Sequence, residues 1–172
     1  MVAHYWSVFL ELIRVPFEHE AMVWGVVPLY FGWMVNELTS ARASYSTATQ
    51  TGFGFLWAGA HWTWQYLHPG AAGGHAREAA PALFAVNVLV TGLVLAVGAV
   101  ALVAGLRRRF PRRCAFLGHT RFSAYFMIAM FPIQSDYLRW TWARLAAILL
   151  FAVPIWFVFY LGLMPFRRKR GR

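Results

Sequence analysis

The polar side chains best suited to chemistry in this sequence lie inside long apolar stretches. His61 lies seven residues before His68, where one stretch ends, and Asn87 lies six residues after Pro81, where the next begins. At a helical rise of 1.5 Å per residue, both lie about 10 Å inside their helix ends. In an antiparallel helix pair they would share one level, so we expect a small polar locus there. We expect this locus to comprise His61, Gln65, Asn87 and Tyr30.

This polar locus has two interpretations. A polar side chain surrounded by apolar helices is costly to bury, so it is a candidate functional group by default. On that interpretation the locus is a ligand, quinone or proton site. The alternative is a structural hydrogen bond that fixes how the helices pack.

Histidines and carboxylates suggest a metal or haem site as a further alternative. Imidazole and carboxylate suit zinc or copper, and His61 and His68 share one helical face because they are seven residues apart. The candidate metal ligands are Glu18, His19, His61 and His68. His61 is also the candidate axial haem ligand. The sequence has no HExxH motif and no repeated ligand spacing, so we expect no metal or cofactor.

Charged residues gather beside the apolar stretches. Glu37 and Arg121 are expected at matching helix ends, where they could form an ion pair; the alternative is that Arg121 extends to lipid phosphates. Two basic runs follow apolar stretches and are expected to bind anionic lipid headgroups. These residues are Arg107, Arg108, Arg109, Arg112, Arg113, Arg167, Arg168, Lys169 and Arg170.

The composition indicates what kind of molecule positions these residues. Of the 172 residues, 60% are hydrophobic and only 13% are charged, whereas about 25% charged is usual for a soluble domain. A soluble globular enzyme and a disordered chain are therefore both excluded. The net charge of +10 lies in short runs beside apolar segments, which argues against nucleic acid as a partner. A single cysteine, Cys114, leaves no intramolecular disulfide.

The apolar stretches predict an all-α integral membrane protein, a single transmembrane domain over residues 1–172. Each crossing needs roughly 20 apolar residues. Five spans are expected, at about residues 21–38, 52–68, 82–106, 116–136 and 142–166. Before them, residues 4–16 carry Trp6, Phe9 and Ile13 at helical spacing. This pattern predicts an amphipathic helix that lies in the membrane interface and ends near Pro16.

The distribution of basic residues predicts the orientation. Loops rich in Arg and Lys stay on the cytoplasmic side, so both basic runs and the tail 167–172 are expected inside and the N-terminus outside. We expect a plasma membrane, of prokaryotic type. The alternative is four spans, with 52–68 in the interface and the N-terminus inside.

Small residues predict how the helices associate. Glycine and alanine four residues apart let helices approach closely in lipid, as at Gly54 and Ala58, Gly92 and Ala96, and Ala101 and Gly105. We therefore expect a non-enzymatic accessory or scaffold subunit that binds partner subunits or copies of itself through such faces. The alternatives are a small transporter or channel that uses the polar locus, and a haem- or metal-binding redox subunit.

Overall fold

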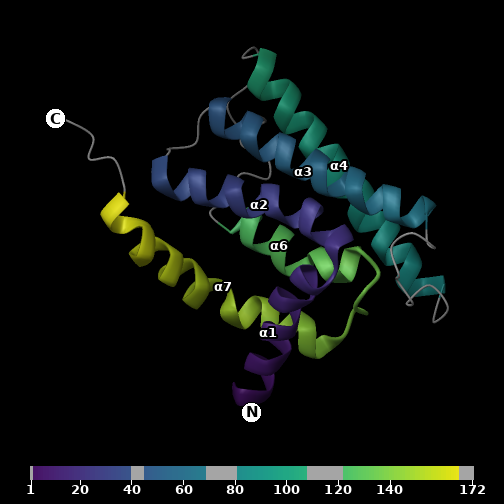
Figure 1. Ribbon diagram of the computed structural model, residues 1–172. Helices are drawn as coiled ribbons and strands as arrows, with labels where there is room; N and C mark the ends of the chain where they lie inside the picture. Colours follow the sequence, from purple (N-terminus) through teal and green to yellow (C-terminus); the bar gives the residue numbers. More distant parts are fainter. Residues whose placement is uncertain (1, 40–44, 69–80, 108–121, 167–172) are drawn as a thin grey trace.

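The computed structural model describes residues 2–39, 45–68, 81–107 and 122–166, and the regular structure in these ranges is entirely helical (Figure 1). The six α-helices are α1 (Val2–Glu18), α2 (Glu20–Thr39), α3 (Tyr45–Leu67), α4 (Pro81–Arg107), α6 (Ser123–Gln134) and α7 (Trp142–Leu163). A 3-10 turn, η2 (Met164–Phe166), continues α7. The all-α expectation is confirmed.

Five of the helices form an up-and-down bundle. Helices α2, α4 and α7 run in one direction, and α3 and α6 run in the other (Figure 1). As a result α2, α4 and α7 begin at the same end of the bundle, which we call the Glu20 end. They finish at the opposite end, which we call the Arg107 end. Helix α1 crosses α7 towards the Glu20 end (Figure 1).

Helix α6 lies at the centre of the bundle. It has only 12 residues, and it packs against α1, α2, α3 and α7. Phe131 and Ile133 are completely buried, and the buried Tyr125 hydroxyl donates a hydrogen bond of 2.7 Å to the backbone oxygen of Ile148 in α7. The apolar stretch that contains α6 is therefore a core element of this bundle.

Helices α3 and α4 form the closest pair, and glycines allow it. A methyl group on Gly52 would lie 2.5 Å from the backbone nitrogen of Leu102, and one on Gly98 would lie 2.8 Å from Cβ of Phe55. Real Cβ atoms do not approach so closely, so backbone meets backbone only because these residues lack a side chain. Ala101, from a predicted small-residue face, is buried in the same region.

Two helices in the described part of the chain are long and apolar enough to cross a membrane, Ala82–Arg107 and Trp142–Phe166. These match two of the five expected spans. Helix α6, at about 18 Å, is shorter than the hydrocarbon core of about 30 Å, and residues 116–121 of that expected span lie outside the described residues. Helix α3 has the length but begins seven residues earlier than expected, at Tyr45, and includes Thr47, Thr51 and Gln65.

Helix α1 is longer than the helix expected over residues 4–16. It continues through Pro16, which is fully buried, to Glu18. Its side chains Phe9 and Leu12 are buried in the core of the bundle, whereas Trp6 and Leu10 are exposed. The helix therefore docks on α7, α6 and α2. The single missing backbone donor of Pro16 is tolerated because packing holds the helix on both sides of it.

Candidate functional site

Three helices meet in a hydrogen-bonded cluster near the Glu20 end. The Tyr66 hydroxyl of α3 donates to the backbone oxygen of Gln134 in α6 at 2.7 Å and lies 3.1 Å from Oε1 of the same residue. The Thr91 hydroxyl of α4 lies 3.3 Å from the Tyr66 hydroxyl and donates to Oε1 of Gln134 at 3.3 Å. Because the last carbonyls of a helix have no partner within it, this contact both completes α6 and joins it to α3 and α4.

A second contact extends this polar region to the chain between α6 and α7. The Trp140 indole nitrogen donates to Oδ1 of the buried Asn87 at 2.7 Å. Asn87 lies one helical turn before Thr91, so both side chains lie on one face of α4. The Asn87 contact therefore anchors a loop to the bundle.

His61 and Gln65 lie beside this cluster on another face of α3. The His61 ring packs against Phe131 of α6 with ring centroids 5.3 Å apart, and a methyl on Gly25 of α2 would lie 2.9 Å from its Nε2. Gln65 is only 3% exposed. Among the described residues, neither Nε2 of His61 nor either amide atom of Gln65 has a hydrogen-bond partner. Such atoms are normally satisfied by a ligand or by ordered water.

The four residues of the predicted polar locus do not form one hydrogen-bonded group. His61 and Gln65 are one turn apart and face α2 and α6, whereas Asn87 faces Trp140. The Tyr30 ring contacts that of Phe17 of α1 in a tilted arrangement, with ring centroids 5.8 Å apart. Among the described residues, no hydrogen bond joins either His61 or Gln65 to Asn87 or Tyr30.

Sequence reasoning missed the residues that carry most of the polar contacts. These are Tyr66, Thr91, Gln134 and Trp140. One signal was available: Thr91 is four residues after Asn87, on the same helical face. Gln134 carried no such signal, because its importance arises from where α6 ends against α3.

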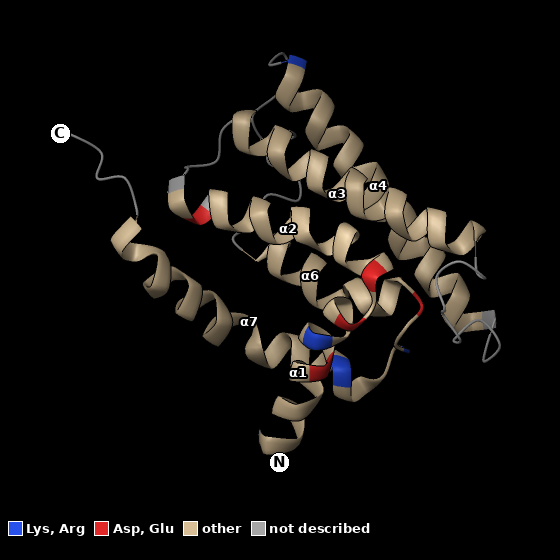
Figure 2. Ribbon diagram, in the orientation of Figure 1, with Lys and Arg blue, Asp and Glu red and all other residues tan. Residues whose placement is uncertain are grey.

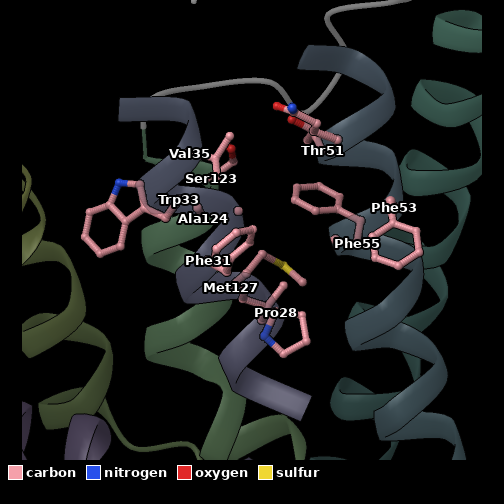
Figure 3. A pocket seen from close by; sticks show the side chains of 14 residues that line it. Pro28, Phe31, Trp33, Val35, Thr51, Phe53, Phe55, Ser123, Ala124 and Met127 are labelled. Carbon is pink, nitrogen blue, oxygen red and sulfur yellow. The ribbon is translucent and has the colours of Figure 1, made fainter. Parts of the chain in front are cut away.

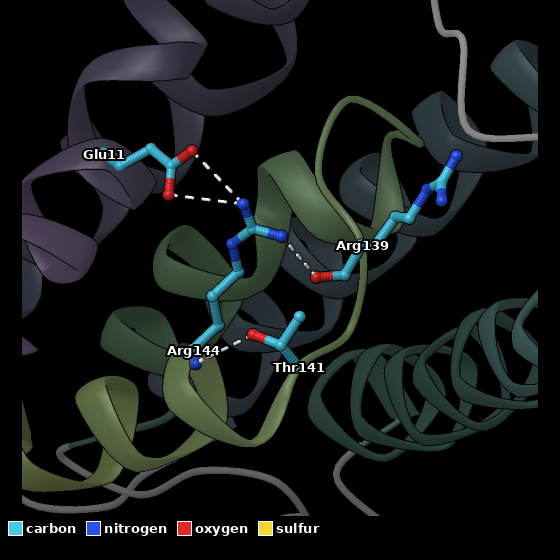
Figure 4. Close-up of polar contacts among 4 residues, drawn as sticks. All are labelled: Glu11, Arg139, Thr141 and Arg144. Atoms are coloured by element: carbon cyan, nitrogen blue, oxygen red, sulfur yellow. Dashed lines mark hydrogen bonds and ion pairs between the residues drawn. The ribbon is translucent and has the colours of Figure 1, made fainter.

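An ion pair holds α1 to α7. Nη2 of Arg144 lies 3.2 Å and 3.3 Å from the two carboxylate oxygens of Glu11 (Figure 4). The same guanidinium donates through Nη1 to the backbone oxygen of Arg139 at 2.7 Å, and Thr141 caps α7 by accepting from the Arg144 backbone (Figure 4). One arginine therefore fixes the beginning of α7, the preceding loop and α1.

The candidate metal ligands are dispersed. Glu18 pairs with Arg14 at 2.8 Å, the His19 ring contacts Tyr137 in a tilted arrangement with ring centroids 4.4 Å apart, and Nδ1 of His68 lies 3.0 Å from the Trp64 carbonyl oxygen. Within the described ranges, no three His, Cys, Asp or Glu side chains are grouped as a metal ion would require. Burial raises the pKa of the Tyr137 phenol.

The predicted ion pair and headgroup residues lie mostly beyond the described ranges. Glu37 is half-buried near the end of α2, and Arg121 is outside the described residues. Arg107 ends α4 and is exposed. Also outside the described residues are Arg108, Arg109, Arg112, Arg113, Arg167, Arg168, Lys169 and Arg170.

An apolar groove opens between α2, α3 and α6 in the half of the bundle towards the Arg107 end (Figure 3). Its volume is about 260 Å³. Phe31, Phe53 and Met127 line its apolar part, and Gln50, Thr51 and Ser123 line the part nearest the Arg107 end. Gly32 of α2 also lines the groove, and a methyl group there would meet no atom within 4 Å.

Helix α4 has two different faces. Gly98 and Ala101 lie on the face that packs on α3. On the opposite side, Gly92 and Ala96 are exposed, and a methyl on Gly92 would meet no atom within 4 Å. Since α4 packs chiefly on α3, the predicted small-residue face at Gly92 and Ala96 is open.

No protein-family model matches the sequence, and neither the curated proteins nor the solved structures give a match.

Proposed function

We propose that the chain is an integral membrane bundle that serves as a non-enzymatic accessory or scaffold subunit. The observation that supports membrane insertion is the exposure of its most apolar helices. Only 28% of the most apolar part of α4, and 22% of that of α7, is buried inside the molecule. The core helix of a soluble protein would be mostly buried, and an exposed apolar surface of this extent is stable only in lipid or against a partner.

The distribution of charge also supports this proposal. Charged side chains of the described residues lie towards the two ends of the bundle and leave an uncharged band between them (Figure 2). At the Glu20 end are Glu11, Arg14, Glu18, Glu20, Asp136, Arg139 and Arg144; at the Arg107 end are Glu37 and Arg107. In the sequence, basic runs follow α4 and α7 at this end, and by the positive-inside rule they support a cytoplasmic Arg107 end.

The open face of α4 is the proposed docking surface for the partner. The outward side chains of α7 are bulky, with Leu149 58% and Val158 63% exposed, which suits disordered lipid chains. The outward face of α4 also carries bulky side chains, with Leu89 73% and Leu93 64% exposed, and between them lie the small residues Gly92 and Ala96. Helices associate in lipid by close packing rather than by the hydrophobic effect, and small residues permit that approach. The partner is therefore a transmembrane helix, from another subunit or from a second copy.

Two glycines give a matched test of this docking surface. A methyl group added to Gly92 of α4 or to Gly162 of α7 would meet no atom within 4 Å. The tagged chain, isolated at native abundance in a mild detergent, should carry a stoichiometric partner or a second copy. Gly92→Trp should lose it because the bulky ring prevents close approach, whereas Gly162→Trp should retain it. A wild-type chain that is isolated alone and monomeric would contradict the docking proposal.

The buried polar atoms of His61 and Gln65 support a second candidate function, a small transporter or channel. Buried amide atoms without partners cost about 1–3 kcal/mol, and a polar solute would satisfy them. In proteoliposomes, this alternative requires that Gln65→Met abolish a solute flux that the wild-type chain carries. The dispersed candidate ligands give no comparable support to the haem or metal alternative.

A further inference from the structure

Helices α2, α3 and α6 are in close contact near the Glu20 end. A methyl group on Gly25 of α2 would lie 2.9 Å from the His61 ring of α3, and it would also overlap the Phe131 ring of α6. Real Cβ atoms do not come so close, so only a glycine fits against these two rings. Gly25 is five residues after Glu20, which places this tight contact within about two turns of the Glu20 end.

Further along α2, the same three helices are apart. Gly32 is seven residues after Gly25, so it lies on the same face of α2, about 10 Å closer to the Arg107 end. It lines the groove, and a methyl group there would meet no atom within 4 Å. Across the groove, a methyl group on Gly54 of α3 would meet only Leu29 among the described residues, at 3.6 Å. Helices α2 and α3 therefore diverge towards the Arg107 end, and the groove is the gap between them (Figure 3).

Helices α3 and α4, in contrast, stay in contact along this half of the bundle. A methyl group on Gly59 of α3 would lie 2.6 Å from the Leu95 side chain of α4. Near the Arg107 end, a methyl group on Gly105 of α4 would lie 2.8 Å from the Thr49 backbone nitrogen of α3. Surfaces packed this closely do not deform continuously, so α3 and α4 form one rigid unit.

Hydrogen bonds join this unit to the rest of the bundle at the Glu20 end. Tyr66 of α3 and Thr91 of α4 both bond to Gln134 at the end of α6, and Asn87 of α4 accepts from Trp140. The groove lies at the opposite end of the same unit. Contacts fixed at one end of a packed unit, with a gap at its other end, are the arrangement of a hinge.

On the far side of the groove, α2 is held by α7. The Trp33 ring of α2 stacks on the Phe159 ring of α7, with centroids 4.0 Å apart and planes at 11°. The groove residues Phe31 and Phe53 are instead 62% and 57% exposed. A gap forfeits the dispersion contacts that packed side chains would make across it, so movement of α3 towards α2 would gain contacts that the open groove lacks.

We propose that α3 and α4 rotate together about their hydrogen bonds at the Glu20 end, so that the groove opens and closes at the Arg107 end. Both positions keep the bonds of Tyr66, Thr91 and Asn87, because these lie at the axis of the rotation. The motion depends neither on the membrane insertion proposed above nor on the docking surface of α4.

Distances between two spin labels test this motion in a Cys114→Ser background. One pair, Met34→Cys in α2 and Leu106→Cys in α4, joins the two helices near the Arg107 end; these side chains are 36% and 66% exposed. The matched pair, Trp24→Cys and Val86→Cys, joins the same helices near the Glu20 end, where the side chains are 71% and 42% exposed.

Pulsed dipolar spectroscopy is carried out in vesicles, with the labelled chain diluted by unlabelled chain so that distances between copies do not contribute. The pair near the Arg107 end should show a second, shorter distance, whereas the pair near the Glu20 end should show a single narrow distance. Single narrow distances for both pairs, or a second distance only near the Glu20 end, would overturn the proposal.

A variant that fills the groove gives the second test. Gly32→Trp should abolish the shorter distance because the ring occupies the space into which α3 moves, whereas Gly162→Trp on the open side of α7 should leave it unchanged. The distance near the Glu20 end should stay the same in both variants, which verifies that they are folded. A shorter distance that persists in folded Gly32→Trp protein would refute the closure. Gly92→Trp, which tests the docking surface, should leave both distances unchanged.

Discussion

Tyr66 and Gln65 are adjacent residues of α3 with opposite hydrogen-bonding situations. Tyr66 joins three helices through its hydroxyl group, whereas the buried amide of Gln65 has no partner among the described residues. The net value of a satisfied hydrogen bond is about 1 kcal/mol, and the cost of an unsatisfied buried polar group is of similar size. Substitutions at the two positions should therefore change stability in opposite directions.

Tyr66→Phe should lower the free energy of unfolding by about 1 kcal/mol. The phenyl ring keeps the packing of Tyr66, but the Gln134 carbonyl oxygen loses its donor. Equilibrium unfolding in mixed detergent micelles measures the change. An unaltered unfolding midpoint would mean that the cluster does not join the helices energetically.

Gln65→Met should raise the free energy of unfolding of the isolated chain, by about 1 kcal/mol. Methionine has nearly the volume of glutamine and removes both unpartnered polar atoms. Equilibrium unfolding in mixed detergent micelles, as for Tyr66→Phe, measures the change. A loss of stability would show that Gln65 has a bonded partner and would favour the structural interpretation of the locus.

The sequence indicated the level at which polar residues occur, but not their partners. Depth along a helix follows from residue counting, but the hydrogen-bonded cluster near the Glu20 end is formed by Tyr66, Thr91 and Gln134, which were not in the predicted locus. Rotation about the helix axis is what separates His61 from Asn87, since His61 faces Phe131 and Asn87 faces Trp140. That rotation depends on which helices pack on α3, and these packing partners cannot be read from the local sequence pattern.

At the scale of elements, Arg144 and Glu11 form an ion pair between α7 and α1, beside the ring contacts of Trp6 and Phe9 with Phe151. The side chains of Arg144 and Glu11 are 18% and 39% exposed, whereas those of Arg14 and Glu18 are 74% and 46% exposed. The two pairs thus allow a comparison of an ion pair between helices with one within a single helix.

A double-mutant cycle with Glu11→Gln and Arg144→Gln should give a coupling energy of about 1 kcal/mol. The matched cycle on Arg14 and Glu18 should give at most about 0.5 kcal/mol, because exposed pairs of this spacing are screened by solvent. Both are measured by unfolding at low and high salt, and the coupling should weaken as salt increases. Equal coupling in the two cycles would contradict the assignment of Arg144 as the anchor of α1.

A second prediction at this scale concerns how glycine substitutions in α3 and α4 change the stability of the bundle. Gly52→Ala should destabilise the bundle by about 1–3 kcal/mol, because its methyl group would overlap the backbone of Leu102. Gly92→Ala, on the open face of the same pair, should stabilise the isolated chain by about 0.5–1 kcal/mol, since alanine favours the helix. Thermal unfolding of both variants is the measurement, and the same sign of change in both would contradict the packing described.

The sequence predicted the positions of the helices better than it predicted which other helices they pack against. The apolar stretches at 82–106 and 142–166 correspond closely to α4 and to α7 with η2. Helix α1 was expected because Trp6, Phe9 and Ile13 recur at helical spacing, but that spacing does not show which helices this face contacts. Glu11 of this helix pairs with Arg144 of α7, and such pairing between distant segments cannot be read from local periodicity.

For the molecule as a whole, the central claim is that the uncharged band of the bundle lies in lipid. The outward side chains of α7 should face acyl chains, and the charged Glu20 end should face water. Spin labels distinguish these environments, because oxygen concentrates in hydrocarbon whereas a charged nickel complex stays in water.

The most direct measurement is therefore the accessibility of single spin labels in vesicles, in a Cys114→Ser background. Labels at Val153 and Val158, both on the exposed face of α7, should be accessible to oxygen and protected from the nickel complex. A label at Arg139, exposed near the Glu20 end, should show the reverse. High nickel accessibility at Val153 and Val158 in the vesicle-bound protein would contradict the membrane bundle and every proposal built on it.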